Sequence, residues 1–162
     1  MEVTVQKQAL EDALRVVRFA KPGSASQGSI PILGCVRLCA KEGRLAVRCT
    51  DIDSEAEIKV DAEVSGEGVA VLPAKTFFDL VRILPDGPVV LKKEGNGAAI
   101  SYNGSQTLLN GYPAEMFPEP PDAAADVEFV MSGEKFKEMY GGVSYAVSSD
   151  RSKPKFTGVF FD

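Results

Sequence analysis

Three carboxylates at alternate positions near residue 50 form the first group whose types and spacing could support chemistry. Asp51, Asp53 and Glu55 could converge on a divalent cation from an extended segment, because carboxylate oxygens are preferred ligands of hard cations. A metal held there could cleave phosphodiesters, so a metal-dependent phosphodiesterase is one hypothesis. The competing interpretation, a solvated turn, is favoured because charge clusters usually cover a surface. A helix-loop-helix calcium site is excluded, since Ala56 stands where that loop requires glycine.

Other catalytic and nucleotide-binding motifs are missing from the sequence. The chain has no histidine, which removes the commonest general base and the usual partner of a serine or cysteine nucleophile. Gly95 and Gly97 lack the third glycine of a dinucleotide-binding loop, and no phosphate-binding loop with Gly-Lys-Ser or Gly-Lys-Thr occurs. We therefore expect a protein that is not an enzyme and that holds no metal and no cofactor.

Basic residues at helical spacing are the second candidate group. They lie opposite the apolar faces of two predicted helices and in one later segment. These residues are Arg15, Arg18, Lys75, Arg82, Arg151, Lys153 and Lys155, with Lys7 and Lys21 near the ends of the first helix. Each helix alone is most simply a solvated face, but recurrence of the pattern favours a binding role. Contacts from such residues would go to phosphates, ignore base sequence and weaken with salt.

The positive charge is segregated rather than abundant. The chain has 18 basic and 23 acidic residues and a net charge of -5, which excludes a generally cationic surface for nucleic acid. The segments 7–21, 75–82 and 134–155 nevertheless carry net charges of +2, +1 and +2. The apolar and charged shares of 44% and 25% are typical of a folded globular protein.

The sequence predicts a cytoplasmic protein without a membrane partner. The N-terminus lacks the basic flank and apolar stretch of a secretory signal, and no apolar run is long enough to cross a membrane. The odd number of cysteines, Cys35, Cys39 and Cys49, indicates reduced thiols that serve as buried packing residues.

The elements that would position these groups repeat as strand, amphipathic helix and strand. The predicted strands cover residues 3–5, 32–40, 44–50, 55–64, 69–71, 89–91, 98–102, 106–109, 127–131 and 156–162. The three predicted helices have apolar faces that include Leu14, Phe77 and Met139, and Ser132 is the expected N-cap of the third. Asn103-Gly104 predicts a tight hairpin turn.

Two of these repeats, 1–66 and 67–112, are expected to form one α+β domain with helices on one side of antiparallel sheets. The segment 113–125 is rich in proline and alanine and is interpreted as an interdomain linker. Residues 126–162 would be the incomplete start of a second domain, because one helix with two strands is marginal in water.

Several short motifs occur in the order and spacing of one known family. They are Ile30-Pro31-Ile32-Leu33-Gly34, Thr50-Asp51-Ile52-Asp53, Pro73-Ala74-Lys75-Thr76-Phe77-Phe78-Asp79, Tyr112-Pro113-Ala114-Glu115 followed by Phe117-Pro118, and the stretch 148–159. Through these motifs the chain resembles the N-terminal part of the bacterial DNA sliding clamp, the beta subunit of DNA polymerase III. The resemblance implies the DNA-clamp fold, in which repeated units build three similar domains and two chains close head to tail around duplex DNA. Helices would line the hole and sheets would lie outside.

The resemblance also implies a role in DNA replication as a non-catalytic processivity factor. It places one set of residues beside double-stranded DNA: Arg15, Arg18, Gln27, Lys75, Arg82, Arg151, Lys153 and Lys155. Gln27 stands where some clamps have arginine, and Pro154-Lys155 where some have paired tyrosines. The replicative polymerase, the clamp loader and other clamp-binding proteins would dock on the outer face.

The resemblance implies two protein-binding sites as well. Phe156 would lie on a strand that contributes to a pocket for partner peptides. A subunit interface of the homodimeric ring would fall within residues 96–110, where Ser105, Thr107 and Leu108 offer polar and apolar packing. A remaining alternative is an interaction module that self-associates through an unpaired strand at 127–131 or at the C-terminal end.

Overall fold

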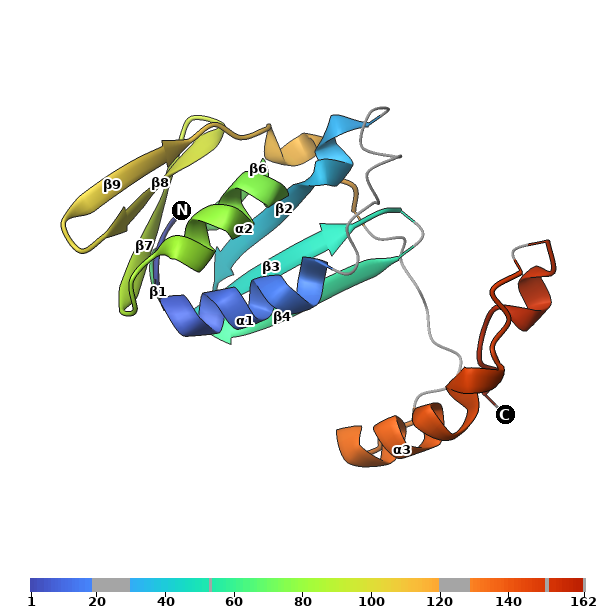
Figure 1. Ribbon diagram of the computed structural model, residues 1–162. Coiled ribbons are helices and arrows are strands. Elements are labelled where there is room, and N and C mark those ends of the chain that lie inside the picture. The colour runs from blue at the N-terminus through green and yellow to red at the C-terminus, as the bar shows by residue number, and fades with distance from the viewer. Residues whose placement is uncertain (19–29, 53, 120–128, 151, 162) are drawn as a thin grey trace. The chain divides into compact units, whose positions relative to one another are not determined.

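The computed structural model describes residues 1–18, 30–52, 54–119, 129–150 and 152–161 (Figure 1). It divides into two compact units, Met1–Pro120 (unit 1) and Pro121–Asp162 (unit 2). The strands of unit 1 are β1 (Glu2–Gln6), β2 (Cys35–Lys41), β3 (Arg44–Thr50), β4 (Glu55–Asp61), β5 (Glu63–Gly66), β6 (Gly68–Pro73), β7 (Pro88–Glu94), β8 (Gly97–Tyr102) and β9 (Ser105–Leu109). Its helices are α1 (Lys7–Val17) and α2 (Ala74–Ile83), with short 3-10 helices η2 (Pro31–Gly34) and η3 (Ala114–Met116).

Unit 1 contains two antiparallel sheets that exchange strands. Sheet A has the order β5-β1-β7-β8-β9, and sheet B has the order β4-β3-β2-β6. The strand before each helix pairs with the first strand after the other helix: β1 pairs with β7, and β6 pairs with β2. Apart from β5, the two sheets therefore have the same arrangement, because β1-β7-β8-β9 in sheet A corresponds to β6-β2-β3-β4 in sheet B. The α+β class with antiparallel sheets is confirmed.

Both helices of unit 1 bury one apolar face and expose the other. Leu10, Ala13, Leu14 and Val17 are buried on α1 because their spacing of three and four residues places them on one side of the helix. On α2 the buried residues are Ala74, Phe77 and Val81. The helices contact each other, and Figure 1 shows them on the same side of the sheets. Their buried faces and the inner faces of both sheets form a single core.

Two predicted strands differ from the observed ones for local reasons. Strand β2 begins at Cys35 rather than at residue 32, because Pro31 starts the 3-10 turn η2 and has no N–H to donate to a sheet. The predicted strand 55–64 is two strands in different sheets. The chain leaves sheet B at Asp61, passes Ala62 and enters sheet A at Glu63. The Asn103-Gly104 turn is as expected, with φ angles of 44° and 74°.

The chain after β9 packs on the outer face of sheet B instead of leaving unit 1 at once. Tyr112 pairs with Val71, where its N–H donates to the Val71 carbonyl at 3.0 Å. Phe117 is buried in a small apolar cluster with Ile32, Leu33 and Val71. The first part of the predicted linker, 113–119, is thus held by unit 1, and residues 120–125 lie outside the described residues.

Unit 2 contains α3 (Gly133–Val143) and the 3-10 helices η4 (Ser144–Ala146) and η5 (Pro154–Phe156). Ser132 caps α3 as predicted, since its hydroxyl accepts a hydrogen bond from the Lys135 N–H at 3.2 Å. The strands expected at 127–131 and 156–162 are wrong for the described residues, which have no strand there. A strand needs a neighbour for its backbone groups, and the described part of unit 2 offers none.

Candidate nucleic-acid interface

An aspartate and an arginine three residues apart recur on the exposed faces of α1 and α2. On α1, Asp12 Oδ1 lies 2.7 Å from Arg15 Nη2. On α2, Asp79 Oδ1 lies 3.8 Å from Arg82 Nη2. Both arginine side chains are 71% exposed. The two helices therefore present the same pair of charges to solvent.

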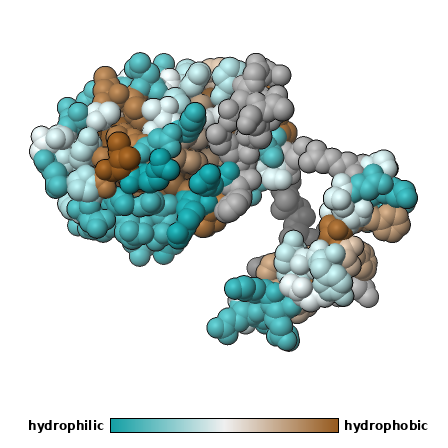
Figure 2. Space-filling model, viewed as in Figure 1, coloured by the Kyte–Doolittle hydropathy of each residue, from teal (hydrophilic) through white to brown (hydrophobic). Residues whose placement is uncertain are grey.

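Burial of the apolar helix faces explains the exposure of the predicted basic residues in unit 1. Leu14 and Val81 point into the core, so residues on the opposite side of each helix point to solvent. The exposed cations on this side are Arg15, Arg18, Lys75 and Arg82. Figure 2, which has the same viewpoint as Figure 1, shows mainly hydrophilic residues on unit 1 with smaller hydrophobic areas. The structure thus brings these four side chains onto the helix-bearing side of one unit.

Lys7 does not belong to this exposed group, although the sequence places it near the end of the basic stripe. It is buried, and its Nζ lies 2.5 Å from Glu11 and 3.8 Å from Asp86. The hydrogen bond to Glu11 raises the pKa of Lys7 above its usual value. Lys7 therefore stabilises the start of α1 and is not available to a ligand in solution.

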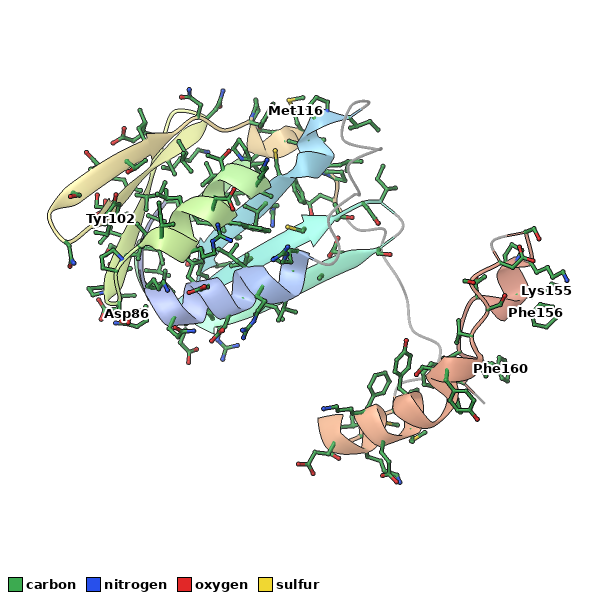
Figure 3. All side chains as sticks on the ribbon, viewed as in Figure 1. Asp86, Tyr102, Met116, Lys155, Phe156 and Phe160 are labelled. Carbon is green, nitrogen blue, oxygen red and sulfur yellow. The ribbon has the colours of Figure 1, made fainter. Side chains whose placement is uncertain are left out.

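In unit 2, Lys153 and Lys155 are exposed in the segment after α3. Figure 3 shows Lys155 and Phe156 projecting from the short helix η5. Phe156 is 65% exposed and lies in this 3-10 turn, so its expected position on a strand is wrong. A surface depression of unit 2 is lined by other residues: Val143, Ala146, Val147, Gly158, Val159 and Phe160. Gln27 and Arg151 lie outside the described residues.

The carboxylates near residue 50 are engaged in a turn and an ion pair. Asp51 Oδ1 accepts a hydrogen bond from the Ser54 N–H at 2.7 Å, and Glu55 Oε2 lies 2.7 Å from Arg48 Nη2. Asp53 lies outside the described residues. Within the described ranges, no three His, Cys, Asp or Glu side chains gather as a metal site would require. The geometry therefore favours the turn over the phosphodiesterase hypothesis.

Arg48 on β3 is a structural residue that the sequence did not reveal. Its side chain is 4% exposed, and it holds Glu119 at 3.1 Å as well as Glu55. It also donates to the Pro118 carbonyl at 2.8 Å and lies over the Phe117 ring, 5.6 Å from its centre. Alternation along β3 could suggest that Arg48 faces away from the core. Except for Glu55, these partners lie about 70 residues away, so no local pattern could have identified them.

The residues expected at a subunit interface lie on β9, at the edge of sheet A. Leu108 is 59% exposed, whereas the Thr107 hydroxyl lies 3.3 Å from the Tyr102 hydroxyl. The strand sequence Ser105-Gln106-Thr107-Leu108-Leu109 contains no charge and no proline, which usually protect an edge from pairing. Among the described residues no further strand pairs with β9, so this edge can accept one from another chain.

The described helices do not include one that is long and apolar enough to span a membrane. All of them are amphipathic or short.

Residues 1–121 match the family model described as DNA polymerase III beta subunit, N-terminal domain. The chain is 28% identical to the beta sliding clamp of Streptomyces coelicolor over 159 residues, which cover 98% of the chain and 41% of that protein. It is 30% identical to the clamp of Synechococcus elongatus, with 98% and 42% coverage. The chain thus spans less than half the length of the curated relatives that it matches.

Solved structures show the same fold. The pol III beta structure of Caulobacter crescentus superposes with a TM-score of 0.85 at 26% identity and covers 98% of this chain and 42% of that one. A sliding clamp from Bartonella birtlesii, solved bound to griselimycin, also gives a TM-score of 0.85 at 25% identity, with 94% and 41% coverage. Together with the family match, these similarities show that the chain belongs to the DNA polymerase III beta subunit family, of which it contains the N-terminal domain.

Proposed function

We propose that this chain is the N-terminal part of a DNA sliding clamp, a non-catalytic processivity factor that holds duplex DNA for a replicative polymerase in the cytoplasm. The observation that carries the proposal is the repeated exposed arginine on α1 and α2, above the sheets of a clamp-family domain. The domain would comprise residues 1–112 in two repeats, 1–66 and 67–112. A linker at 113–125 and the start of a second domain at 126–162 would follow.

The exposed cations of the helices suit contacts with DNA that ignore base sequence. A guanidinium or ammonium group on a rigid helix can contact phosphates, which occur at every step of a duplex. We assign this role to Arg15, Arg18, Lys75 and Arg82 of unit 1 and to Lys153 and Lys155 of unit 2, and by resemblance to Gln27 and Arg151. A ring of two full-length chains would add enclosure, so that each contact can remain weak.

Two protein contacts complete the proposal. The open edge at β9, with Ser105, Thr107 and Leu108, would meet another chain in the ring, because an edge strand without charges can pair with a partner. Phe156 would contribute to the pocket for peptides of the polymerase, the clamp loader and other clamp-binding proteins. In the described structure its ring is exposed, as a partner site requires.

The helix contacts can be tested by charge removal on α1 and α2. In the double variant Arg15→Gln and Arg82→Gln, we expect weaker binding of duplex DNA at low salt. The slope of log K against log salt should fall by about 1 for each arginine, because each lost phosphate contact releases one fewer counterion. Fluorescence anisotropy of labelled duplexes over a salt series measures both quantities.

Arg44→Gln is the matched control for this experiment. Arg44 is an exposed arginine on β3 that also pairs with an aspartate, Asp61 at 3.7 Å, but the pair is at the side of the sheet facing away from the core. We expect its affinity and salt slope to stay near those of the unchanged chain. Because this control removes one positive charge and the double variant removes two, a change in slope and in log affinity half as large as in the double variant would show that net charge alone, and not the helix face, governs binding.

A further inference from the structure

We propose that Asp12 and Asp79 are charge partners that limit how strongly the helices hold DNA. The proposal rests on the assignment of α1 and α2 to the DNA-facing side. It extends that assignment from the cations to the acids beside them, which set the strength and the salt dependence of the contact.

The two aspartates occupy equivalent positions on α1 and α2, the helices of the two repeats. Each lies three residues before an exposed arginine and opposite the buried face of its helix. The aspartate side chains are themselves about half exposed, at 47% for Asp12 and 57% for Asp79. A carboxylate and a guanidinium side by side at the same place on both helices would meet the same phosphate backbone together.

Folding does not explain these aspartates. An exposed ion pair between residues three apart contributes little to stability, because water screens it and both side chains lose freedom. The aspartates also lie outside the first turn of either helix, where an acid would interact favourably with the helix dipole. Their effect therefore falls mainly on the electrostatics of the exposed face.

The acids lower the charge of each helix face to the same small value. Apart from Lys7 and Glu11, which pair with each other, the charged side chains are Asp12 and Arg15 on α1 with Arg18 at its C-cap, and Lys75, Asp79 and Arg82 on α2. Each set has a net charge of +1. A phosphate that approaches Arg15 or Arg82 is repelled by the neighbouring carboxylate and must compete with it for the guanidinium. Contacts of this kind form and break readily, as a protein that moves along DNA requires.

The test removes each negative charge and keeps the shape of the side chain. In the full 162-residue chain, Asp12→Asn and Asp79→Asn are each expected to raise duplex affinity at low salt by about three- to tenfold. That is the size expected when one like charge about 6 Å from a phosphate is removed in an exposed setting. The double variant should show the two effects multiplied and a steeper decrease of affinity with salt.

Glu57→Gln together with Asp61→Asn provides the matched control. These two replacements change the net charge by the same amount as the double aspartate variant. The replaced residues, however, alternate on β4 with Ala56, Ile58 and Val60, which pack against the core. They therefore lie on the other side of sheet B from the helices. Affinity in this control should rise by less than twofold, and circular dichroism of all variants should match that of the unchanged chain.

The outcomes separate this inference from the proposed function. If the arginine variants lose affinity while the aspartate variants bind as the unchanged chain does, the inference is wrong and the proposed interface stands. If the control gains as much as the double aspartate variant, the inference is also wrong, because only total charge matters. If neither the unchanged chain nor the double aspartate variant binds duplex DNA at low salt, both the inference and the assigned interface are wrong.

Discussion

Replacement of Phe77 by alanine is expected to lower the free energy of unfolding of unit 1 by about 3–5 kcal/mol. Phe77 has no exposed surface and belongs to the core beneath α2. Its removal costs the transfer free energy of the ring and leaves a cavity that the surrounding strands cannot fill completely. Urea unfolding followed by circular dichroism measures the change.

Phe78→Ala is the natural comparison for this variant. Phe78 is the next residue of the same helix, but it is only partly buried against the core. We expect a clearly smaller loss of stability, since less apolar surface returns to water. Equal effects of the two replacements would contradict the buried orientation of Phe77. Such a result would also contradict the assignment of Lys75 and Arg82 to the exposed face of α2.

Replacement of Arg48 by alanine is expected to lower the free energy of unfolding by about 3 kcal/mol, near the lower end for loss of a buried ion-pair partner. The remaining carboxylate of Glu119 is 65% exposed and can regain water, which limits the cost. The replacement also removes the guanidinium group that lies over the Phe117 ring and the hydrogen bond that it donates to the Pro118 carbonyl. Release of residues 117–119 should make this segment sensitive to limited proteolysis before unit 1 unfolds.

Arg44→Ala tests whether burial, rather than charge, determines this effect. Arg44 lies on the same strand, but its side chain is 62% exposed. We expect a change within about 0.5 kcal/mol, as for most surface replacements. If both variants unfold at the same urea concentration, or if cleavage of the Met116–Phe117 bond by a protease of broad specificity does not increase in Arg48→Ala, Arg48 does not hold the segment in place.

Local patterns predicted the helices and most strands of unit 1. The spacing of Leu10, Leu14 and Val17 identified the buried face of α1, because helical periodicity depends only on nearby residues. The Asn103-Gly104 turn was equally visible, since few residues adopt positive φ angles. These features required no knowledge of the remainder of the chain.

Long-range pairing could not be predicted from such patterns. Alternation along 55–64 continues without interruption, yet the two halves of this segment lie in different sheets. The docking of Phe117 depends on a surface built from β2, β3 and β6, which no local pattern describes. Sequence reasoning identifies which side of a strand is buried, but it does not identify the neighbouring strand.

The candidate site also contains residues whose surroundings local patterns predicted and residues whose surroundings depend on distant segments. Arg15 and Arg82 were predicted to be exposed because they lie opposite apolar residues on their helices, and the structure places them there. Lys7 carries the same charge at a similar spacing, but Asp86 approaches it from the segment between α2 and β7. Phe156 lies in a turn rather than a strand because the described part of unit 2 offers no pairing partner.

The exchange of β1 and β6 between the sheets has a consequence for the order of events during synthesis on the ribosome. Strand β1 precedes both of its partners, and the second of them, β7, begins only at Pro88, so most of sheet A must wait while sheet B can already assemble around β2, β3 and β4. Pairings between distant segments also slow folding, because long loops must close first. Nascent chains that end before β7 would therefore leave β1 and α1 without a completed core, and the apolar surface exposed in that state favours aggregation.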